Sequence, residues 1–246
     1  MDILKLSKVA KSVKDKQILQ NINLTVAEGE ILGLLGPNGA GKTTMMKLIS
    51  GLSLPTSGSI EIAGLNALKE RCKVKNKIGF VMQDNNMERE FTVKEALIHY
   101  ARLYKIDNYK QAVTQIIDKF AMQEWQERRI DKLSGGMARK AMIARALLAK
   151  PQLLLMDEPS VGLDPDVRLD IWEEIKKMRE MGISIIITTH YMDEAEQLCD
   201  RIAILKAGQL LAIDTVEGIK HLVMKSVAEE LTLEKAFLRF IGREVI

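Results

Sequence analysis

The chain is short of cysteine and has no long apolar run. Cys72 and Cys199 are the two cysteines among 246 residues, too few and too far apart for a disulfide framework, so a reducing compartment is expected. No run approaches the roughly 20 apolar residues that cross a bilayer, and residues 1–11 lack the apolar segment of a secretory signal. We therefore expect a cytoplasmic protein with no membrane span of its own.

Aromatic residues are also scarce, at 4% of the chain, and residues 1–79 contain none. The formal net charge is only +3, and no stretch combines basic with aromatic residues, so we expect no nucleic-acid partner. The densest basic stretch, KERCKVKNK at 69–77, is interpreted first as a solvated face and second as a surface attracted to an anionic membrane. The remaining composition, 47% apolar and 28% charged, is that of an ordinary globular protein.

Strand patterns and helix patterns alternate along most of the chain. The predicted strands, rich in Ile, Leu and Val, are 3–9, 18–26, 30–36, 57–64, 77–83, 151–157 and 183–190, with a hairpin over 201–213 that turns at Ala207 and Gly208. The predicted helices are 42–52, 92–104, 109–122, 135–149, 165–181 and 191–199. Apolar strands that alternate with helices indicate an α/β fold whose parallel sheet is covered on both faces. Strand signals nearly vanish over 92–150, which predicts an inserted helical subdomain.

Residues 36–43, GPNGAGKT, match the phosphate-loop pattern G-x-x-x-x-G-K-[ST] between a predicted strand and a predicted helix. The small residues allow backbone N–H groups to surround a phosphate, and the helix N-terminus adds a partial positive charge. Lys42 can reach the β- and γ-phosphates, while the Thr43 hydroxyl can bind Mg²⁺. A plain glycine turn is the alternative, but the complete motif in this context favours a nucleotide site. The residues assigned to it are Gly36, Pro37, Asn38, Gly39, Ala40, Gly41, Lys42, Thr43 and Thr44.

Polar residues stand where three apolar strands are predicted to end. Asp157 and Glu158 follow LLLM, Gln83 ends KIGFVMQ and His190 ends ISIIITTH. Ligands of an open parallel sheet collect at the carboxyl ends of its strands. Asp157 can hold Mg²⁺ through water, Glu158 can orient or deprotonate an attacking water, and His190 can donate to a γ-phosphate oxygen. Capping or solvated acids and a structural histidine are the alternatives.

A second glycine-rich segment, LSGGM at 133–137, precedes a strong helix pattern. Ser134 is a good N-cap, and the N–H groups that follow it, from Gly135 and Gly136 onward, can bind an anion. The segment has neither a preceding strand nor a Walker lysine, so it is interpreted as half of a site that another copy of the chain completes. An ordinary capped helix is the alternative.

Taken together, GPNGAGKT, Gln83, LSGGM, LLLMDEP, SVGLD at 160–164 and His190 resemble the ATPase subunit of an ABC transporter over nearly the whole chain. The resemblance implies a P-loop NTPase core with a mostly parallel sheet, an N-terminal antiparallel β subdomain and the inserted helical subdomain. It implies a head-to-tail homodimer around two ATP molecules with Mg²⁺, in which Ser134 and Gly136 contact the γ-phosphate bound to the opposite chain. Asp164 would lie at the dimer contact, and Gln83 would respond to Mg²⁺ and transmit closure to integral membrane permease subunits.

On this resemblance residues 1–246 form a single ABC ATPase domain at the inner face of the cell membrane. Residues 1–91 and 151–212 would form its nucleotide-binding core, 92–150 its helical subdomain and 213–246 a C-terminal helical tail. Two positions depart from the family pattern. Met137 stands where many members have glutamine, and Val13 stands near the position where the family stacks adenine on an aromatic ring. Val13 offers only apolar contact, so we predict weak discrimination among purine nucleotides.

Met137, THYMDEAE at 189–196 and LEKAFLRFIGRE at 233–244 resemble the exporter branch with separate ABC-2-like membrane subunits. Such an ATPase would close on ATP, reopen after hydrolysis and thereby power export. The tail segment can equally be an amphipathic helix packed on its own domain. Two other functions stay open at this point: a non-transport ABC ATPase, for instance in iron–sulfur assembly, and an importer ATPase.

Overall fold

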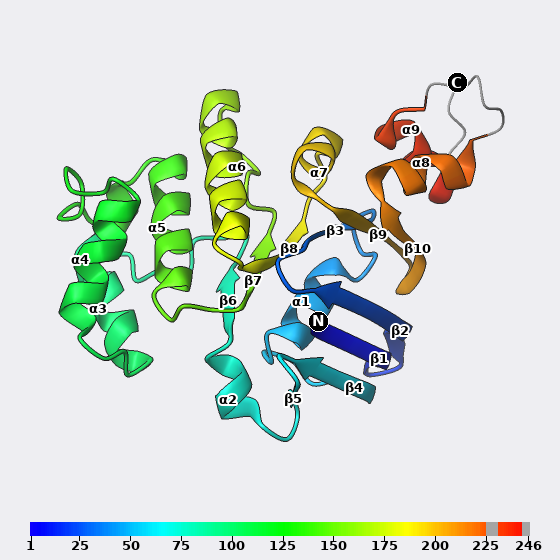
Figure 1. The fold of residues 1–246 in the computed structure, drawn as a ribbon, viewed down its shortest axis with the longest axis horizontal. Coiled ribbons are helices and arrows are strands. Elements are labelled where there is room, and N and C mark those ends of the chain that lie inside the picture. The colour runs from blue at the N-terminus through cyan, green and yellow to red at the C-terminus, as the bar shows by residue number, and fades with distance from the viewer. Residues whose placement is uncertain (225–230, 243–246) are drawn as a thin grey trace.

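The structure is a computed structural model that describes residues 1–224 and 231–242. Figure 1 shows its elements along the longest axis of the molecule. The strands are β1 (Asp2–Val13), β2 (Lys16–Ala27), β3 (Ile31–Leu35), β4 (Ser57–Ile62), β5 (Leu65–Asn66), β6 (Ile78–Val81), β7 (Leu153–Asp157), β8 (Ser184–Thr188), β9 (Arg201–Lys206) and β10 (Gln209–Thr215). The helices are α1 (Lys42–Ile49), α2 (Arg71–Lys75), α3 (Val93–Leu103), α4 (Tyr109–Lys119), α5 (Gly135–Leu147), α6 (Pro165–Glu180), α7 (Met192–Leu198), α8 (Val216–Val223) and α9 (Leu233–Phe240), with a 3₁₀ turn at Ile130–Lys132.

The described strands form two sheets. The larger has six strands in the order β10-β9-β3-β8-β7-β6, and every neighbouring pair in it is parallel except β10 and β9. The smaller is antiparallel, in the order β2-β1-β4-β5. This arrangement confirms the predicted α/β fold with a mostly parallel sheet and an N-terminal antiparallel sheet.

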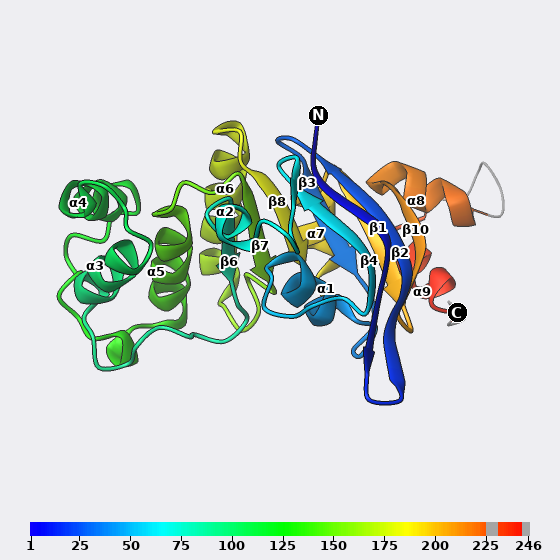
Figure 2. The ribbon, with the colours of Figure 1, turned by 90° about the horizontal axis from the view of Figure 1, so that it is seen from below.

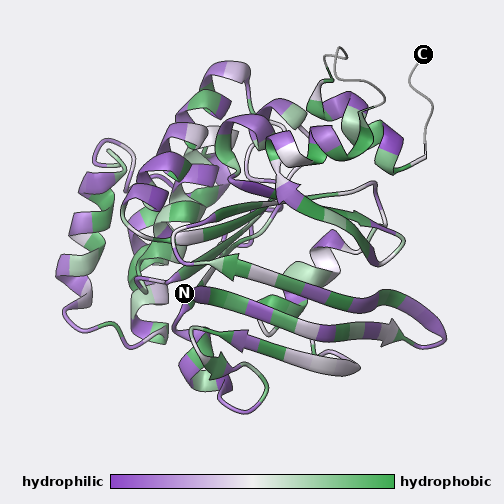
Figure 3. Cartoon of the chain, turned by 45° about the vertical axis from the view of Figure 1, so that its right-hand side comes forward, coloured by the Kyte–Doolittle hydropathy of each residue, from purple (hydrophilic) through white to green (hydrophobic). Residues whose placement is uncertain are grey.

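Alternate residues of the parallel strands pack into two different cores. Leu153 and Leu155 of β7 belong to a cluster with α1 and the antiparallel sheet, whereas Leu154 and Met156 belong to a cluster with α5, α6 and α7. The parallel sheet is therefore buried on both faces, as continuous apolar strands require. In Figure 3 these central strands are coloured mostly hydrophobic, while hydrophilic and hydrophobic residues alternate along the surrounding helices.

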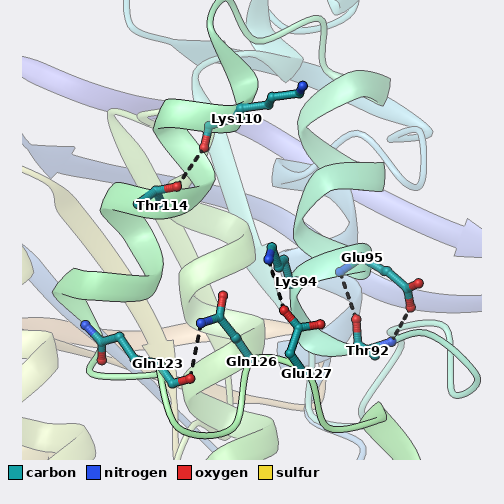
Figure 4. Close-up of polar contacts among 8 residues, drawn as sticks. All are labelled: Thr92, Lys94, Glu95, Lys110, Thr114, Gln123, Gln126 and Glu127. Carbon is teal, nitrogen blue, oxygen red and sulfur yellow. Dashed lines mark hydrogen bonds and ion pairs between the residues drawn. The ribbon is translucent and has the colours of Figure 1, made fainter.

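The helices α3, α4 and α5 lie together at one end of the long axis, and α8 and α9 lie at the other (Figures 1 and 2). The first turn of α3 is fixed by a capping box, in which the Thr92 hydroxyl accepts from the N–H of Glu95 and the Glu95 carboxylate accepts from the N–H of Thr92 (Figure 4). Lys94 pairs with Glu127 at 2.9 Å and ties the same turn to the loop after α4. The helices α3, α4 and α5 all fall within residues 92–150.

Several boundaries differ from the sequence-based expectation. The strand β6 ends at Val81, so Gln83 lies two residues beyond it, and β10 continues to Thr215, inside the segment predicted as a helical tail. The basic stretch at 69–77 contains the short helix α2, whose cationic side chains are exposed around the buried Val74. In the tail, Leu233, Ala236 and Phe237 of α9 pack into the main core, which supports packing on its own chain. Residues 243 and 244 of the tail motif lie outside the described residues.

Candidate functional site

Lys42, the first residue of α1, forms hydrogen bonds back to the loop between β3 and α1. The ammonium Nζ of Lys42 donates to the carbonyl oxygens of Gly36, at 2.6 Å, and Pro37, at 3.3 Å. The loop also carries a turn in which the N–H of Ala40 donates to the carbonyl oxygen of Pro37 at 3.1 Å. The glycines are needed sterically as well: a Cβ at Gly36 would lie 2.3 Å from the carbonyl oxygen of Leu205, and Gly41 has φ +111°.

Lys42 is 7% exposed, and this burial lowers the pKa of its ammonium group. The carboxylates of Glu158 and Asp157 act in the opposite direction and favour the charged form. A poorly solvated cation that already faces two acids is well suited to bind a polyanion such as a nucleotide phosphate chain, because the anion replaces water that the lysine has lost.

A pocket of about 940 Å³ opens over this loop. Its lining joins loop residues to the ends of three neighbouring strands, β6, β7 and β8, as the sequence predicts. The predicted residues that line it are Asn38, Gly39, Ala40, Gly41, Lys42, Thr43, Thr44, Gln83, Glu158 and His190. The lining also includes Lys16, Gln17, Ile18 and Ala207, which sequence reasoning did not select.

Glu158 and His190 are in contact beyond the carboxyl ends of β7 and β8. The imidazole Nε2 of His190 lies 2.5 Å from the Glu158 carboxylate oxygen Oε1, and the Glu158 side chain is 12% exposed. The backbone of Glu158 has φ +50°, a left-handed conformation that costs a non-glycine residue roughly 1–3 kcal/mol and recurs at functional sites. Its N–H donates to the carbonyl oxygen of Thr188 at 3.1 Å and to the Thr188 hydroxyl at 3.0 Å.

Asp157 is 5% exposed and does not line the pocket directly. Its oxygen Oδ1 accepts a short hydrogen bond from the hydroxyl of Thr188 on β8, the neighbouring strand. Thr188 therefore contacts both acidic residues and was missed at the sequence level. A polar hydroxyl near the end of the apolar segment ISIIITTH is the sequence signal that could have identified it.

The segment LSGGM lies away from this pocket. Ser134, Gly135 and Gly136 are not among the lining residues, and along the long axis α5 lies beyond β6 and β7 on the side away from α1 (Figures 1 and 2). Ser134 is exposed, and its hydroxyl caps α5 by accepting from the N–H of Met137 at 3.3 Å. A Cβ at Gly136 would lie 2.5 Å from the side chain of Val167, so any larger residue there would have to displace Val167 of α6, independently of any ligand.

Asp164 and Val13 are likewise outside the pocket lining. Asp164 is exposed at the N-cap position of α6, where its side chain makes no capping hydrogen bond. Val13 is 53% exposed at the end of β1 and pairs in register with Lys16 at the start of β2. The part of the β1–β2 hairpin that borders the pocket is thus Lys16, Gln17 and Ile18, which contribute no aromatic ring.

Arg139 is a buried residue near the site that sequence reasoning missed. It is 6% exposed on α5, and its guanidinium donates from Nη1 to the carbonyl oxygen of Met82 at 2.8 Å and from Nη2 to that of Gln83 at 3.0 Å. Burial lowers the pKa of Arg139, and the surrounding carboxylates, led by Glu194 and Asp157, oppose that shift. An arginine among apolar helix positions, five residues after Ser134, is the only sequence signal for this contact.

Comparison with known proteins agrees with this geometry. Residues 19–161 match the family model described as ABC transporter. The Nod factor export ATP-binding protein I of Rhizobium etli is 42% identical over 223 residues, which are 90% of this chain and 69% of that protein. The linearmycin resistance ATP-binding protein LnrL of Bacillus subtilis is 40% identical over 215 residues, which are 87% of this chain and 69% of that protein.

Solved structures of the same kind superpose on the chain. An ATP-binding subunit of an ABC transporter aligns with a TM-score of 0.86 at 26% identity, over 97% of this chain and 99% of its own. The ATP-binding cassette MJ0796, in a dimeric post-hydrolysis state bound to ADP and Pi, aligns with a TM-score of 0.77 at 28% identity, over 86% of this chain and 98% of its own.

The chain therefore belongs to the ABC transporter family, and it is an ATP-binding subunit that hydrolyses ATP. ATP-binding cassettes of this family form dimers and bind ATP or its product ADP. Within residues 1–224 and 231–242, no helix combines the length and apolar character that crossing a membrane requires.

Proposed function

We propose that the chain is the ATPase of an exporter, which dimerises around two Mg-ATP molecules and drives a separate membrane permease. The observation that carries this proposal is that the predicted nucleotide-binding residues of one chain do not all lie at one pocket. The pocket holds the phosphate loop with Gln83, Glu158 and His190, whereas the exposed Ser134 at the start of α5 lies outside it. A second chain in head-to-tail orientation would bring its own Ser134 and Gly136 to this pocket, with Asp164 at the contact.

Within one pocket, each residue has a distinct proposed role. Lys42 and the backbone N–H groups of the phosphate loop hold the β- and γ-phosphates. Glu158 orients or deprotonates the attacking water, and its backbone strain is offset by the two hydrogen bonds to Thr188. His190, whose Nε2 contacts Glu158, donates to a γ-phosphate oxygen when ATP is bound. The pair thereby acts on the bond that hydrolysis breaks.

The oxygen donors at the pocket suit Mg²⁺, which favours hydroxyl, amide and carboxylate oxygens together with nucleotide phosphates. Thr43 and Gln83 line the pocket, and the buried Asp157 behind them would act through water. An ion bound with ATP would neutralise charge on the β- and γ-phosphates. The hydrogen bond from Thr188 holds one oxygen of Asp157 in place for this contact.

A groove of about 510 Å³ between α1, α2 and α3 is the proposed docking site of the permease. Three large apolar side chains that line it are unusually exposed: Leu52 at 63%, Leu54 at 45% and Leu103 at 64%. Exposed apolar residues gathered in one groove are typical of protein interaction sites. The position would place the chain at the inner face of the cell membrane, in contact with the integral membrane permease subunits.

Export rather than import is supported by the two relatives, which are named for Nod factor export and for linearmycin resistance. A neighbouring gene that encodes a six-span protein would support the proposal, and co-expression of that protein with this chain would test it. We expect a stable complex whose ATPase activity in membranes requires both proteins. Co-purification with a soluble scaffold would favour a non-transport ATPase instead, and a substrate-binding protein encoded alongside would favour an importer.

A further inference from the structure

Glu194, in the first turn of α7, is a fully buried carboxyl group that lies outside the pocket. Its oxygen Oε1 accepts hydrogen bonds from the hydroxyl of Ser160, at 2.6 Å, and from the indole Nε1 of Trp172, at 2.7 Å. Its second oxygen, Oε2, has no hydrogen-bond partner among the described residues. Burial raises the pKa of Glu194. Such a group is costly to keep inside a protein, so its contacts require an explanation.

The two donors and the acceptor come from three different segments. Ser160 is two residues after Glu158, and Glu194 is four residues after His190. Trp172 belongs to α6, the helix that begins next to Asp164. One carboxylate oxygen thus joins the loop that carries the proposed base, the loop that carries its histidine partner and the helix at the proposed dimer contact.

These bonds are themselves shielded from water. Ser160 is 1% exposed and Trp172 is 6% exposed, so their hydrogen bonds to Glu194 have no competing solvent. The turn that carries His190 is further fixed because the Thr189 hydroxyl accepts from the N–H of Tyr191 at 3.0 Å. The loops of Glu158 and His190 are therefore connected through buried hydrogen bonds at Glu194.

We propose that Glu194 is a positioning residue for ATP hydrolysis, which holds the loop of Glu158 and the loop of His190 in register. The proposal rests on the catalytic roles given above to these two residues. The positions of these two loops matter because displacing a reacting group by about 1 Å can lower the reaction rate roughly 100-fold. Glu194 has no place in the pocket lining, so it acts through its neighbours and not on the nucleotide.

Steady-state ATP hydrolysis by the purified full chain tests the role. Glu194→Ala removes the acceptor, and we expect kcat to fall roughly 10- to 100-fold while the KM for ATP changes less than about twofold. Glu194→Gln keeps an oxygen acceptor of the same shape and should restore most of kcat. Glu196→Ala is the matched control. Glu196 is also a residue of α7, but its carboxylate is exposed and pairs with Lys220, so this variant should keep the original kcat.

A purely structural role would lower the melting temperature of Glu194→Ala and leave kcat per folded molecule unchanged, and that result overturns the proposal. Should Glu194→Ala fail to fold, Ser160→Ala and Trp172→Phe each remove one donor, and Ser160→Ala does so with little change in volume. A lower kcat at unchanged KM in both supports the role, and an unchanged kcat in both rejects it.

Measurements in the Glu158→Gln variant distinguish a failure of this proposal from a failure of the catalytic role proposed for Glu158. If Glu194 acts through Glu158, adding Glu194→Ala to Glu158→Gln should cause no further loss, because effects through one group are not additive. A full additional loss would reject positioning through Glu158. Normal hydrolysis by Glu158→Gln alone would instead reject the catalytic assignment on which the proposal depends.

Discussion

The guanidinium of Arg139 donates a hydrogen bond to the backbone carbonyl oxygen of Gln83 at 3.0 Å, and so joins α5 to the segment that follows β6. The helix that begins at the Ser134 loop and the residue proposed to sense Mg²⁺ are thereby held together. Any rotation of α5 on dimer closure would therefore displace the backbone at Gln83. The two-pronged contact, with Met82 as the second acceptor, depends on the planar fork of arginine.

Arg139→Lys should therefore reduce ATP turnover although it conserves charge. A lysine cannot bond two consecutive carbonyl groups in this geometry, and a lost buried charge-assisted bond is worth about 1.5–3 kcal/mol, or roughly 10- to 100-fold. We expect kcat to fall while nucleotide binding to the isolated chain persists. Lys140→Met, which removes an exposed pair with Asp170, is the control, and equal activity in both variants would contradict the coupling.

Glu158→Gln should reduce hydrolysis severely but preserve ATP binding. The amide cannot accept the proton of the attacking water, and loss of a general base typically costs about 10²- to 10⁴-fold. Because the bridging γ-phosphate is then retained, size-exclusion chromatography with Mg-ATP should show a trapped dimer. Hydrolysis at the original rate would remove Glu158 from its proposed role.

Lys42→Ala should weaken nucleotide binding roughly 10- to 100-fold, because the charge-assisted contact with the phosphates is lost. Fluorescence titration with a labelled ATP analogue would measure the affinity. Lys47→Ala alters an exposed lysine of the same helix and should bind normally. An unchanged affinity in Lys42→Ala would argue against the phosphate-loop assignment.

Ser134→Arg should leave ATP binding by the monomer intact and prevent the ATP-dependent dimer. The bulky cation would occupy the surface proposed to meet the partner's nucleotide, whereas its own pocket lies elsewhere. Ser134→Ala is the control for lost helix capping, a change that costs about 1 kcal/mol. The idea fails if chromatography shows ATP-dependent dimers of Ser134→Arg.

Base selectivity should be weak. The border of the pocket at Lys16, Gln17 and Ile18 supplies no aromatic ring, and Val13 is exposed outside it. Stacking therefore cannot favour adenine. We expect similar kcat/KM values for ATP and GTP under matched conditions, and a strong preference for ATP would contradict this prediction.

Local signals in the sequence were enough for the parts of the site that depend on one segment. The complete phosphate-loop pattern identified its loop, and polar residues at strand ends predicted that Gln83, Glu158 and His190 would meet at one edge of the sheet. The contacts of Thr188, Arg139 and Glu194 could not be predicted, because each joins segments at least 22 residues apart. The requirement for Gly136 next to Val167 is equally invisible before α5 and α6 are packed together.

The separation of LSGGM from the pocket of its own chain has a consequence for kinetics. If every complete site takes its parts from two molecules, a lone chain with bound ATP is only half of an enzyme. The rate at saturating ATP should then rise with the square of the protein concentration at high dilution and become linear once dimers dominate. Turnover per molecule would thus report how often two chains meet, which a membrane partner holding them side by side would make independent of dilution.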